Sequence, residues 1–371
     1  MKIVHIFHHY WPVVGGLENA MKALAEEQAR LGHEVHVITS TYGAEGRPRE
    51  EEIGGVHVHR TSAAKLGYPD LMLPLERLVI LKHAEIVHAW SQTSLFTYVI
   101  ARNAKRLNKT LVYYFLGVDY LKNHHNLLIR ILGSKYQMYL TKEIAKYTDA
   151  ALVVNEYEGK LLRAQYGLEP HVVPHGIDDM YLNTPNRAEE FRRKFRIEGT
   201  IIGYVGRIHS TKGLDLLIRA FPRVVKERPD AMLVIAGKGD EKYFAHCLKL
   251  AEKLGMRKRI AYLGFISEED KIGLIDASEL IVVPSRHAGE SFPLLVAEVK
   301  ARGKPIVATN RGALPYLIRD GEEGLITDAD PRSLGEAITR VLRESDRFHV
   351  KSKPLTWREV AYEIIKIYKE I

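Results

Sequence analysis

Apolar residues in the first half of the chain form short, β-branched runs that alternate with longer segments of helical period. We expect seven of these runs to be strands, at residues 2–7, 34–40, 56–62, 86–91, 110–115, 150–155 and 171–176. Several are continuously apolar, as strands covered on both faces of a sheet must be. Between the first two, residues 17–33 carry apolar side chains at helical spacing. The alternation predicts βαβ units and a parallel sheet.

The second half of the chain repeats this rhythm. Six more strands are expected, at residues 201–208, 231–237, 259–264, 280–285, 305–310 and 324–327. The charged stretch 183–200 has no strand character, and we place the joint between two domains there. Residues 356–371 predict one amphipathic helix. The fold class is therefore α/β, with two Rossmann-like doubly wound domains at residues 1–182 and 183–355, facing a cleft at the carboxyl ends of both sheets.

Composition narrows the class of protein. The single cysteine, Cys247, excludes an internal disulfide framework, and no Cys/His spacing suggests a zinc site. The N-terminus has the pattern of a strand and not of a signal peptide, and no apolar window is long enough to span a membrane. We expect a cytoplasmic protein, with any membrane contact peripheral on the inner face.

Positive charge is concentrated in the second half of the chain. The net charge is +8, of which +1 falls in residues 1–180 and +7 in the remainder. An anionic partner fits this excess. Nucleic acid is one candidate, but the sequence holds no recognised nucleic-acid-binding motif, and a phosphorylated small molecule fits equally well. The third explanation is that the excess lysines and arginines only solvate the exposed faces of helices.

A glycine turn follows the first strand. Gly15 and Gly16 remove side chains where a helix begins, and the free N–H groups of a helix start suit an anion. A strand–helix turn that needs glycine only for its geometry explains the pattern as well. His9, beside this turn, is a candidate for an acceptor-binding role.

A second loop, at residues 203–221, carries two cations beside a helix start. Arg207 and Lys212 precede Gly213, so both could hold a diphosphate leaving group as its bond breaks. The alternative is a pair of solvated loop cations. The glycine-rich turn 236–244 lacks the third glycine of a dinucleotide fingerprint, but a nucleotide could lie there.

Two other segments have competing interpretations. The Asp-x-Asp at residues 328–330 resembles a metal motif, but Asp330 before Pro331 predicts a helix N-cap, so we expect no metal. Residues 126–147 are basic and amphipathic. They fit either a membrane surface, with a lipid-linked acceptor, or an ordinary core helix with extended lysines.

Two glutamates, Glu290 and Glu298, bracket an apolar run just before a Gly-Lys-Pro turn. Together with four other segments they resemble the family-4 retaining glycosyltransferases of GT-B fold, of the glycosyltransferase group 1 type. The resemblance covers nearly the whole chain. Its carriers are VVGGLE (13–18), VVPHGID (172–178), VGRIHSTKG (205–213), GESFPLLVAE (289–298) and ARGKPIVAT (301–309).

The resemblance implies a donor site and its catalytic residues. Arg207 and Lys212 would bind the donor diphosphate, and Glu290 would lie by the donor sugar and stabilise the charged transition state. Glu298 would accept hydrogen bonds from the ribose, and Gly16 would lie against the donor phosphate. Further donor contacts would come from the other turn glycine and from the residues around the start of the helix, namely Gly15, Phe292, Pro293, Leu294 and Leu295. The helix 356–371 would cross back to the first domain.

The chain departs from the family pattern on the sugar and acceptor side. Leu116 stands where many members carry a histidine, although Asp119 is kept. Pro293 replaces a common glycine, and Tyr316 replaces a glutamate. These changes affect the identity of the sugar and acceptor more than the class of reaction.

The prediction is hexosyl transfer with retention, from a nucleotide-diphosphate sugar such as a UDP- or GDP-hexose to a hydroxyl of a sugar, polyol or lipid-linked acceptor. No cofactor, metal or nucleic acid is expected. The alternatives are another GT-B enzyme (a sugar-nucleotide epimerase or a phosphorylase), a hydrolase that uses the two glutamates as acid and base, and a basic nucleic-acid-binding protein without enzymatic activity.

Overall fold

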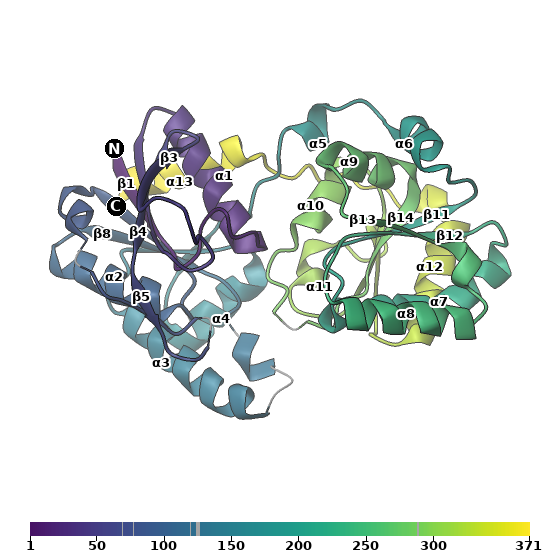
Figure 1. Cartoon of the computed structure of the whole chain (residues 1–371), viewed down its shortest axis with the longest axis horizontal. Coiled ribbons are helices and arrows are strands. Elements are labelled where there is room, and N and C mark those ends of the chain that lie inside the picture. Colours follow the sequence, from purple (N-terminus) through teal and green to yellow (C-terminus); the bar gives the residue numbers. More distant parts are fainter. Residues whose placement is uncertain (69, 77, 119, 124–126, 288) are drawn as a thin grey trace. The chain divides into compact units, whose positions relative to one another are not determined.

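The computed structural model describes residues 1–68, 70–76, 78–118, 120–123, 127–287 and 289–371. The chain forms two compact units (Figure 1). Unit 1 comprises residues Met1–Gly176 and Leu355–Ile371, and unit 2 comprises residues Ile177–Pro354. The boundary between the two units lies a few residues before the predicted end of the first domain at residue 182. The reason is that α5 (Met180–Asn183) places Tyr181 in the apolar core of unit 2.

Unit 1 is built on an eight-stranded sheet with the order β10-β9-β8-β7-β1-β2-β4-β3. Its strands are β1 (Lys2–Ile6), β2 (Glu34–Ser40), β3 (Glu50–Ile53), β4 (Val56–Thr61), β7 (Ile86–Trp90), β8 (Thr110–Phe115), β9 (Ala150–Val153) and β10 (Pro170–Val172). All neighbours are parallel except β3, which runs antiparallel to β4. The seven strands predicted in this half are confirmed. Strand β3 and the hairpin of β5 (Ala63–Lys65) and β6 (Met72–Pro74) were not predicted.

Alternation along β1 directs side chains to the two faces of this sheet. Val4 and Ile6 join the apolar cluster beneath α2 (Leu95–Arg106), α3 (Ser134–Ala145) and α4 (Glu156–Tyr166). On the other face, His5 Nε2 donates to Gln28 of α1 (Gly16–Arg30) at 2.7 Å. Gln28 in turn donates to the Tyr368 hydroxyl of α13 (Trp357–Glu370) at 3.3 Å. The C-terminal helix therefore packs in unit 1.

Unit 2 contains a six-stranded parallel sheet with the order β13-β12-β11-β14-β15-β16. Its strands are β11 (Ile201–Val205), β12 (Met232–Ala236), β13 (Ile260–Gly264), β14 (Ser278–Val283), β15 (Ile306–Thr309) and β16 (Gly324–Thr327). All six were predicted. Counted in chain order within the unit, they follow the Rossmann order 3-2-1-4-5-6.

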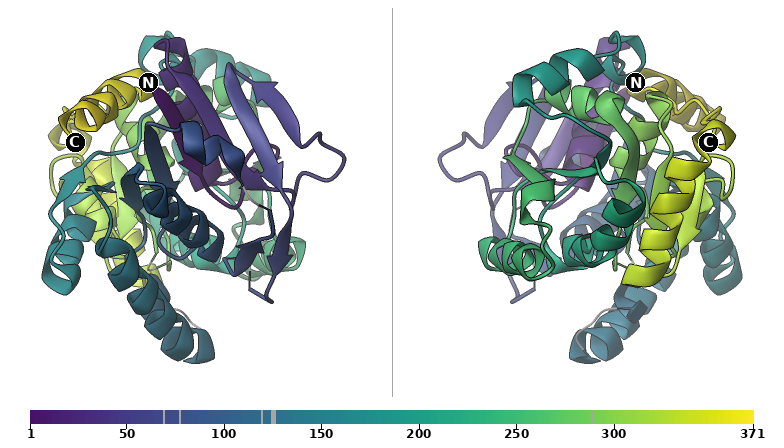
Figure 2. Two further views of the ribbon diagram at one scale, coloured as in Figure 1. Left: turned by 90° about the vertical axis from the view of Figure 1, so that its left-hand side faces the viewer. Right: turned by 90° about the vertical axis from the view of Figure 1, so that its right-hand side faces the viewer.

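Helices cover both faces of the unit 2 sheet (Figures 1 and 2). One face packs against α7 (Leu214–Glu227), α8 (Glu241–Lys253) and α12 (Pro331–Arg343). The other packs against α6 (Ala188–Phe195), α9 (Glu268–Ala277), α10 (Leu294–Ala301) and the short α11 (Leu314–Leu317). The stretch 183–200 thus contains α6, which belongs to unit 2. Over the part of the chain that the structure describes, no helix is both long and apolar enough to span a membrane.

Candidate active site

The strand order of unit 2 reverses between β11 and β14. Ligands of doubly wound sheets bind beyond the carboxyl ends of the strands at such a reversal. After β11 the chain continues through Arg207 to Lys212, and after β14 it continues to Glu290. The two loops that carry the predicted catalytic residues therefore leave neighbouring strands at the same edge of the sheet.

Lys212 and Glu290 form an ion pair at this edge. The Glu290 carboxylate is only 7% exposed, and the Ser285 hydroxyl donates to the same oxygen at 2.9 Å. The backbone carbonyl of Glu290 accepts from the N–H of Ala313 at 2.7 Å. A buried carboxylate is tolerated when its charge is paired and its oxygens accept hydrogen bonds. The structure thus joins two of the three predicted catalytic residues, and adds Ser285, which the sequence did not indicate.

Arg286 fixes the loop that carries Lys212. Its guanidinium binds both carboxylate oxygens of Asp215, at 2.6 and 2.9 Å. The backbone N–H of Arg286 donates to the backbone carbonyl of Thr211 at 2.7 Å. Burial alone would raise the pKa of Asp215, but the hydrogen bonds from Arg286 and Tyr243 lower it below its ordinary value. The carboxylate therefore stays ionised, and the start of α7 is tied to the loop after β14.

Arg207 is exposed and forms no ion pair with any residue that the structure describes. The backbone beside it is fixed, because the Ile208 N–H donates to Lys238 O at 2.9 Å. A Cβ on Gly237 would lie 1.9 Å from Gly206 O. Close approach of two backbones thus explains the glycine-rich turn 236–244 and holds Arg207 at the end of β11.

The helix α10 begins at Leu294, as predicted, with Pro293 at its N-cap. The N–H groups at the first positions of a helix have no partner within the helix, and here they belong to Leu294 and Leu295. The preceding Phe292 packs against the apolar core of this face. The N-terminus of α10 follows directly on the Glu290 loop.

Glu298 lies in the second turn of α10 and has its own cation. Lys271 Nζ of α9 is 3.0 Å from the Glu298 carboxylate and 2.8 Å from that of Glu268. Burial raises the pKa of Glu298. Burial disfavours the charged form of Lys271, but Glu298 and Glu268 raise its pKa above the ordinary value. Glu290 and Glu298 therefore have separate lysine partners, and Lys271 was not predicted.

The remaining predicted residues belong to unit 1. Gly15 is the N-cap of α1 and Gly16 its first residue. An added Cβ on Gly16 would meet no atom within 4 Å. His9 lies just beyond the carboxyl end of β1, half-buried, and burial lowers its pKa. Asp119 lies outside the described residues.

Leu116, in the place of the family histidine, is held by Gln92. The Gln92 side chain donates to Leu116 O at 3.0 Å and accepts from the Leu116 N–H at 2.9 Å. Both interactions involve the Leu116 backbone, so they do not depend on its side chain.

The Asp-x-Asp motif has a structural role, as predicted. The Asp330 side chain accepts from the N–H groups of Arg332 and Ser333, at 2.9 and 3.0 Å, and caps α12. Within the described ranges, no group of three or more His, Cys, Asp or Glu side chains is arranged to hold a metal ion.

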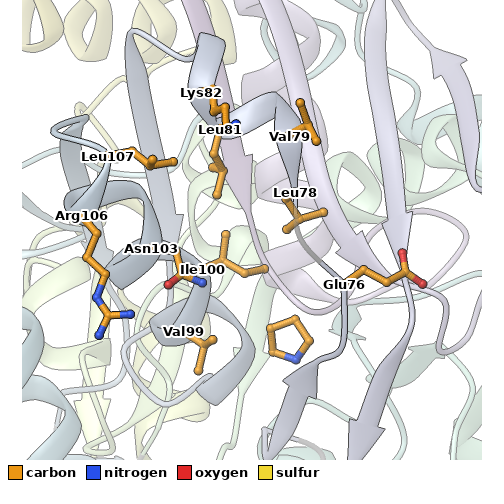
Figure 3. Close-up of a pocket in the computed structure, with 11 residues that line it drawn as sticks. Glu76, Leu78, Val79, Leu81, Lys82, Val99, Ile100, Asn103, Arg106 and Leu107 are labelled. Atoms are coloured by element: carbon orange, nitrogen blue, oxygen red, sulfur yellow. The ribbon is translucent and has the colours of Figure 1, made fainter.

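Unit 1 also has a pocket of about 400 Å³ beside α2 (Figure 3). Apolar side chains such as Leu81 and Ile100 line it, and Lys82 and Arg106 add two cations. None of the predicted site residues that the structure describes lines this pocket.

Comparison with known proteins identifies the class. The model for Glycosyltransferase Family 4 matches residues 14–180, and that for Glycosyl transferases group 1 matches residues 187–362. An uncharacterized glycosyltransferase of Methanocaldococcus jannaschii is 28% identical, over 100% of this chain and 98% of that protein. D-inositol 3-phosphate glycosyltransferase of Corynebacterium jeikeium is 30% identical, over 54% of this chain and 51% of that protein.

Solved structures agree on the fold. Sucrose-phosphate synthase of Thermosynechococcus elongatus superposes with a TM-score of 0.79 at 20% identity, over 100% of this chain and 98% of that one. Anabaena HepE, in complex with UDP and glucose, gives a TM-score of 0.76 at 17% identity over 100% of both chains. The protein is therefore a glycosyltransferase of GT-B fold. Within that class, the chain belongs to the glycosyltransferase group 1 family, with a family 4 N-terminal part.

Proposed function

We propose that the protein transfers a hexosyl unit from a nucleotide-diphosphate sugar, such as a UDP- or GDP-hexose, to a hydroxyl acceptor. Transfer retains the anomeric configuration and needs no metal ion or other cofactor. The observation that carries the proposal is the pair of Lys212 and buried Glu290 at the strand-order reversal of unit 2. A neighbour of the same fold, Anabaena HepE, binds UDP and glucose, which supports a nucleotide-sugar donor.

In this proposal, cations replace the metal. Arg207 and Lys212 neutralise the diphosphate as the bond to the sugar breaks, and the N–H groups of Leu294 and Leu295 add a helix start. The diphosphate competes with Glu290 for the ammonium of Lys212. Glu290 is then left beside the sugar, where its negative charge stabilises a transition state with positive charge on the ring.

The reaction balances without a side-chain nucleophile. The bond between the anomeric carbon and the diphosphate oxygen breaks, and the acceptor oxygen forms its bond on the same face of the sugar. The acceptor proton passes to the leaving phosphate. This front-face course yields a retained product.

The other predicted residues address the rest of the two substrates. Glu298 binds the ribose hydroxyls, Phe292 and Pro293 flank the donor, and Gly15 and Gly16 approach its phosphate. His9 and Asp119 serve the sugar and acceptor side. The acceptor is a sugar, polyol or lipid-linked hydroxyl, and a lipid-linked acceptor calls for peripheral contact with the inner face of the membrane.

The decisive variant is Lys212→Ala. Loss of one preorganised charge at a transition state costs about 10²-fold or more in kcat, so transfer from each nucleotide sugar should fall by at least that factor. Lys194→Ala is the matched control, because it removes another lysine of unit 2 from an ion pair (with Asp270, 2.6 Å), and Lys194 is not among the residues proposed to contact the donor. Equal activity of both variants, with unchanged melting temperatures, would reject the assignment.

Product analysis tests the remaining parts of the proposal. The anomeric signal of the product in NMR should match that of the donor, and a chelator should leave the rate unchanged. An epimerised nucleotide sugar, a sugar phosphate formed with inorganic phosphate, or hydrolysis without any nucleotide would each contradict transfer.

A further inference from the structure

One helix of unit 1 exposes an unusual number of large apolar side chains. Residues 127–145 form a helical segment made of residues 127–128, a π-helical turn (Ile129–Gly133) and α3. Its exposed apolar side chains are Leu127 (56% exposed), Leu128 (69%), Ile131 (46%), Leu132 (64%), Met138 (46%) and Tyr139 (63%). Single exposed leucines are ordinary, but a contiguous apolar patch marks an interaction site.

The two halves of this segment are held differently. Leu140 and Ile144 of α3 are buried in the core of unit 1. The π-helical turn contributes no buried residue. The C-terminal half thus anchors the helix, and its N-terminal half extends beyond the sheet of unit 1 (Figures 1 and 2).

Charge over residues 127–142 of the segment has one sign. Residues 127–142 contain three cations and no acid. The cations, Arg130, Lys135 and Lys142, are exposed and form no ion pair within the described part of the chain. The first acid is Glu143, which pairs with Lys146.

The combination of exposed apolar side chains and cations indicates which kind of partner binds this helix. Leucine and isoleucine at one end of a helix, with a tyrosine and lysines along the same exposed side, fit the boundary between headgroups and acyl chains of a bilayer. The uncompensated cations match anionic headgroups, to which each basic side chain near the surface adds attraction.

We propose that the basic apolar face, defined as the exposed side chains of residues 127–142, binds the surface of a membrane that contains anionic phospholipids. The helix lies in the interface, with Leu128 and Leu132 entering the acyl boundary and Lys135 and Lys142 contacting headgroups. This inference deepens the membrane contact of the proposed function by naming the surface and the lipid class. It does not require transfer activity.

Co-sedimentation of the full chain with vesicles tests the proposal. One set of vesicles is phosphatidylcholine alone, and in the other about a third of the lipid is phosphatidylglycerol. We expect binding to the anionic vesicles, weakened by salt, and little binding to the neutral ones. Leu128→Ser with Leu132→Ser should lower the partition coefficient about tenfold or more, and Lys135→Gln with Lys142→Gln should lower it and flatten its salt dependence.

Two pairs of control substitutions test whether vesicle binding depends specifically on the basic apolar face. Val79→Ser with Leu107→Ser removes exposed apolar side chains at the pocket of Figure 3 in the same unit. Lys242→Gln with Lys253→Gln removes two exposed lysines of unit 2. Both controls should bind vesicles like the unaltered chain, and melting temperatures should show that every variant is folded.

Three results would overturn the proposal. They are absence of binding to anionic vesicles, equal loss in the control variants, and a concentration-dependent dimer in ultracentrifugation that Leu128→Ser with Leu132→Ser abolishes without affecting vesicle binding. The last result would assign the face to a second copy of the chain. Because binding is measured without substrate, failure here leaves the transfer proposal standing, and loss of transfer in Lys212→Ala leaves the membrane proposal standing.

Discussion

Glu298 shares the ammonium of Lys271 with Glu268, but the two carboxylates differ in burial. Glu298 is 12% exposed at its side chain and Glu268 is 55% exposed. Only the buried carboxylate lies on α10, directly after the helix start proposed to hold the diphosphate. The pair therefore supplies a matched comparison within one ion-pair network.

We expect Glu298→Gln to weaken donor binding through loss of contact with the ribose. A hydrogen bond to a charged group contributes about 1.5–3 kcal/mol, so the affinity for a nucleoside diphosphate should fall about tenfold or more. Calorimetry with the ribose and 2′-deoxyribose forms of the same ligand measures this effect. The unaltered protein should discriminate between the two forms, and Glu298→Gln should not.

Glu268→Gln is the control for that experiment, because it removes the exposed partner of the same lysine. It should keep the discrimination between ribose and deoxyribose. If it behaves like Glu298→Gln, the effect belongs to Lys271 and the proposed ribose contact is wrong.

Gly16 is a glycine that the fold of unit 1 does not require. It begins α1, and a Cβ there would meet nothing within 4 Å. We expect Gly16→Ala to fold with unchanged or slightly higher stability, since alanine is favoured over glycine in helices by about 1 kcal/mol. Donor affinity should fall if the proposed contact exists, because a methyl group would stand where the donor phosphate is proposed to approach.

Thermal unfolding and donor titration distinguish these effects. Gly159→Ala, within α4, is the control, since a Cβ there would make only ordinary contacts, the nearest at 3.6 Å. Equal donor affinity of the two variants would remove Gly16 from the site.

A comparison of two glycines distinguishes the effect of backbone strain from the effect of close packing between elements. Gly213, before α7, and Gly303, after α10, have nearly the same positive φ, 71° and 69°. A Cβ on Gly303 would meet nothing within 4 Å, whereas one on Gly213 would lie 1.9 Å from Pro284 O in the loop after β14. Gly213 therefore sets how closely the Lys212 loop approaches the loop that leads to Glu290.

Gly303→Ala should cost about 1–2 kcal/mol of unfolding free energy, from the left-handed conformation alone. Gly213→Ala adds a steric clash and should cost several kcal/mol or displace the loop, with loss of transfer. Denaturant unfolding of unit 2 and activity at saturating donor provide the two measurements. Equal costs for the two substitutions would contradict a packing role for Gly213.

Elements with a strong apolar signal could be predicted from the sequence, and those that depend on the edge of a sheet could not. All thirteen predicted strands are present. Strand β3 was missed because its Glu-Glu-Glu-Ile sequence carries no apolar alternation, and its pairing with β4 along the sheet edge is a backbone property. The hairpin of β5 and β6 is three residues per strand, too short for a periodic signal.

The candidate site was predictable to the same extent. The loops of Lys212 and Glu290 carry their own sequence patterns, and the start of α10 was placed correctly. Lys271 precedes Glu298 by 27 residues, and Arg286 follows Asp215 by 71, so their pairing depends on the strand order and leaves no local signal. The proposed roles of the site residues rest on the family resemblance.

At the scale of the whole molecule, buried histidines are concentrated in unit 1. Burial lowers the pKa of His5 to about 4 and the pKa values of His8 and His175 to about 3, from an ordinary 6.5. His88, beside the C-terminal helix, has its pKa lowered too. All four belong to residues 1–176. Below pH 6.5 these imidazoles are protonated in the unfolded chain, but they must be neutral for unit 1 to fold.

The sign of the effect follows from these shifts. Because the folded pKa values lie below the unfolded value, the stabilisation is complete above pH 6.5 and is lost as the pH falls from 6.5 towards 4 and 3. One pH unit below 6.5, each such histidine lowers the unfolding free energy of unit 1 by about 1.4 kcal/mol. We therefore expect unit 1 to unfold at a lower denaturant concentration than unit 2 at pH 5.5, with a smaller difference at pH 7.5.

The sequence supplies separate probes for the two units. All three tryptophans, Trp11, Trp90 and Trp357, lie in unit 1, and the single cysteine, Cys247, is buried in unit 2. Tryptophan fluorescence therefore reports unfolding of unit 1, and thiol labelling of Cys247 reports unfolding of unit 2. Acidification from pH 7.5 to 5.5 should move the fluorescence midpoint to lower denaturant by more than it moves the labelling midpoint. Equal movement of both midpoints would show that acid acts on the whole chain, and the buried histidines would then not govern its acid stability.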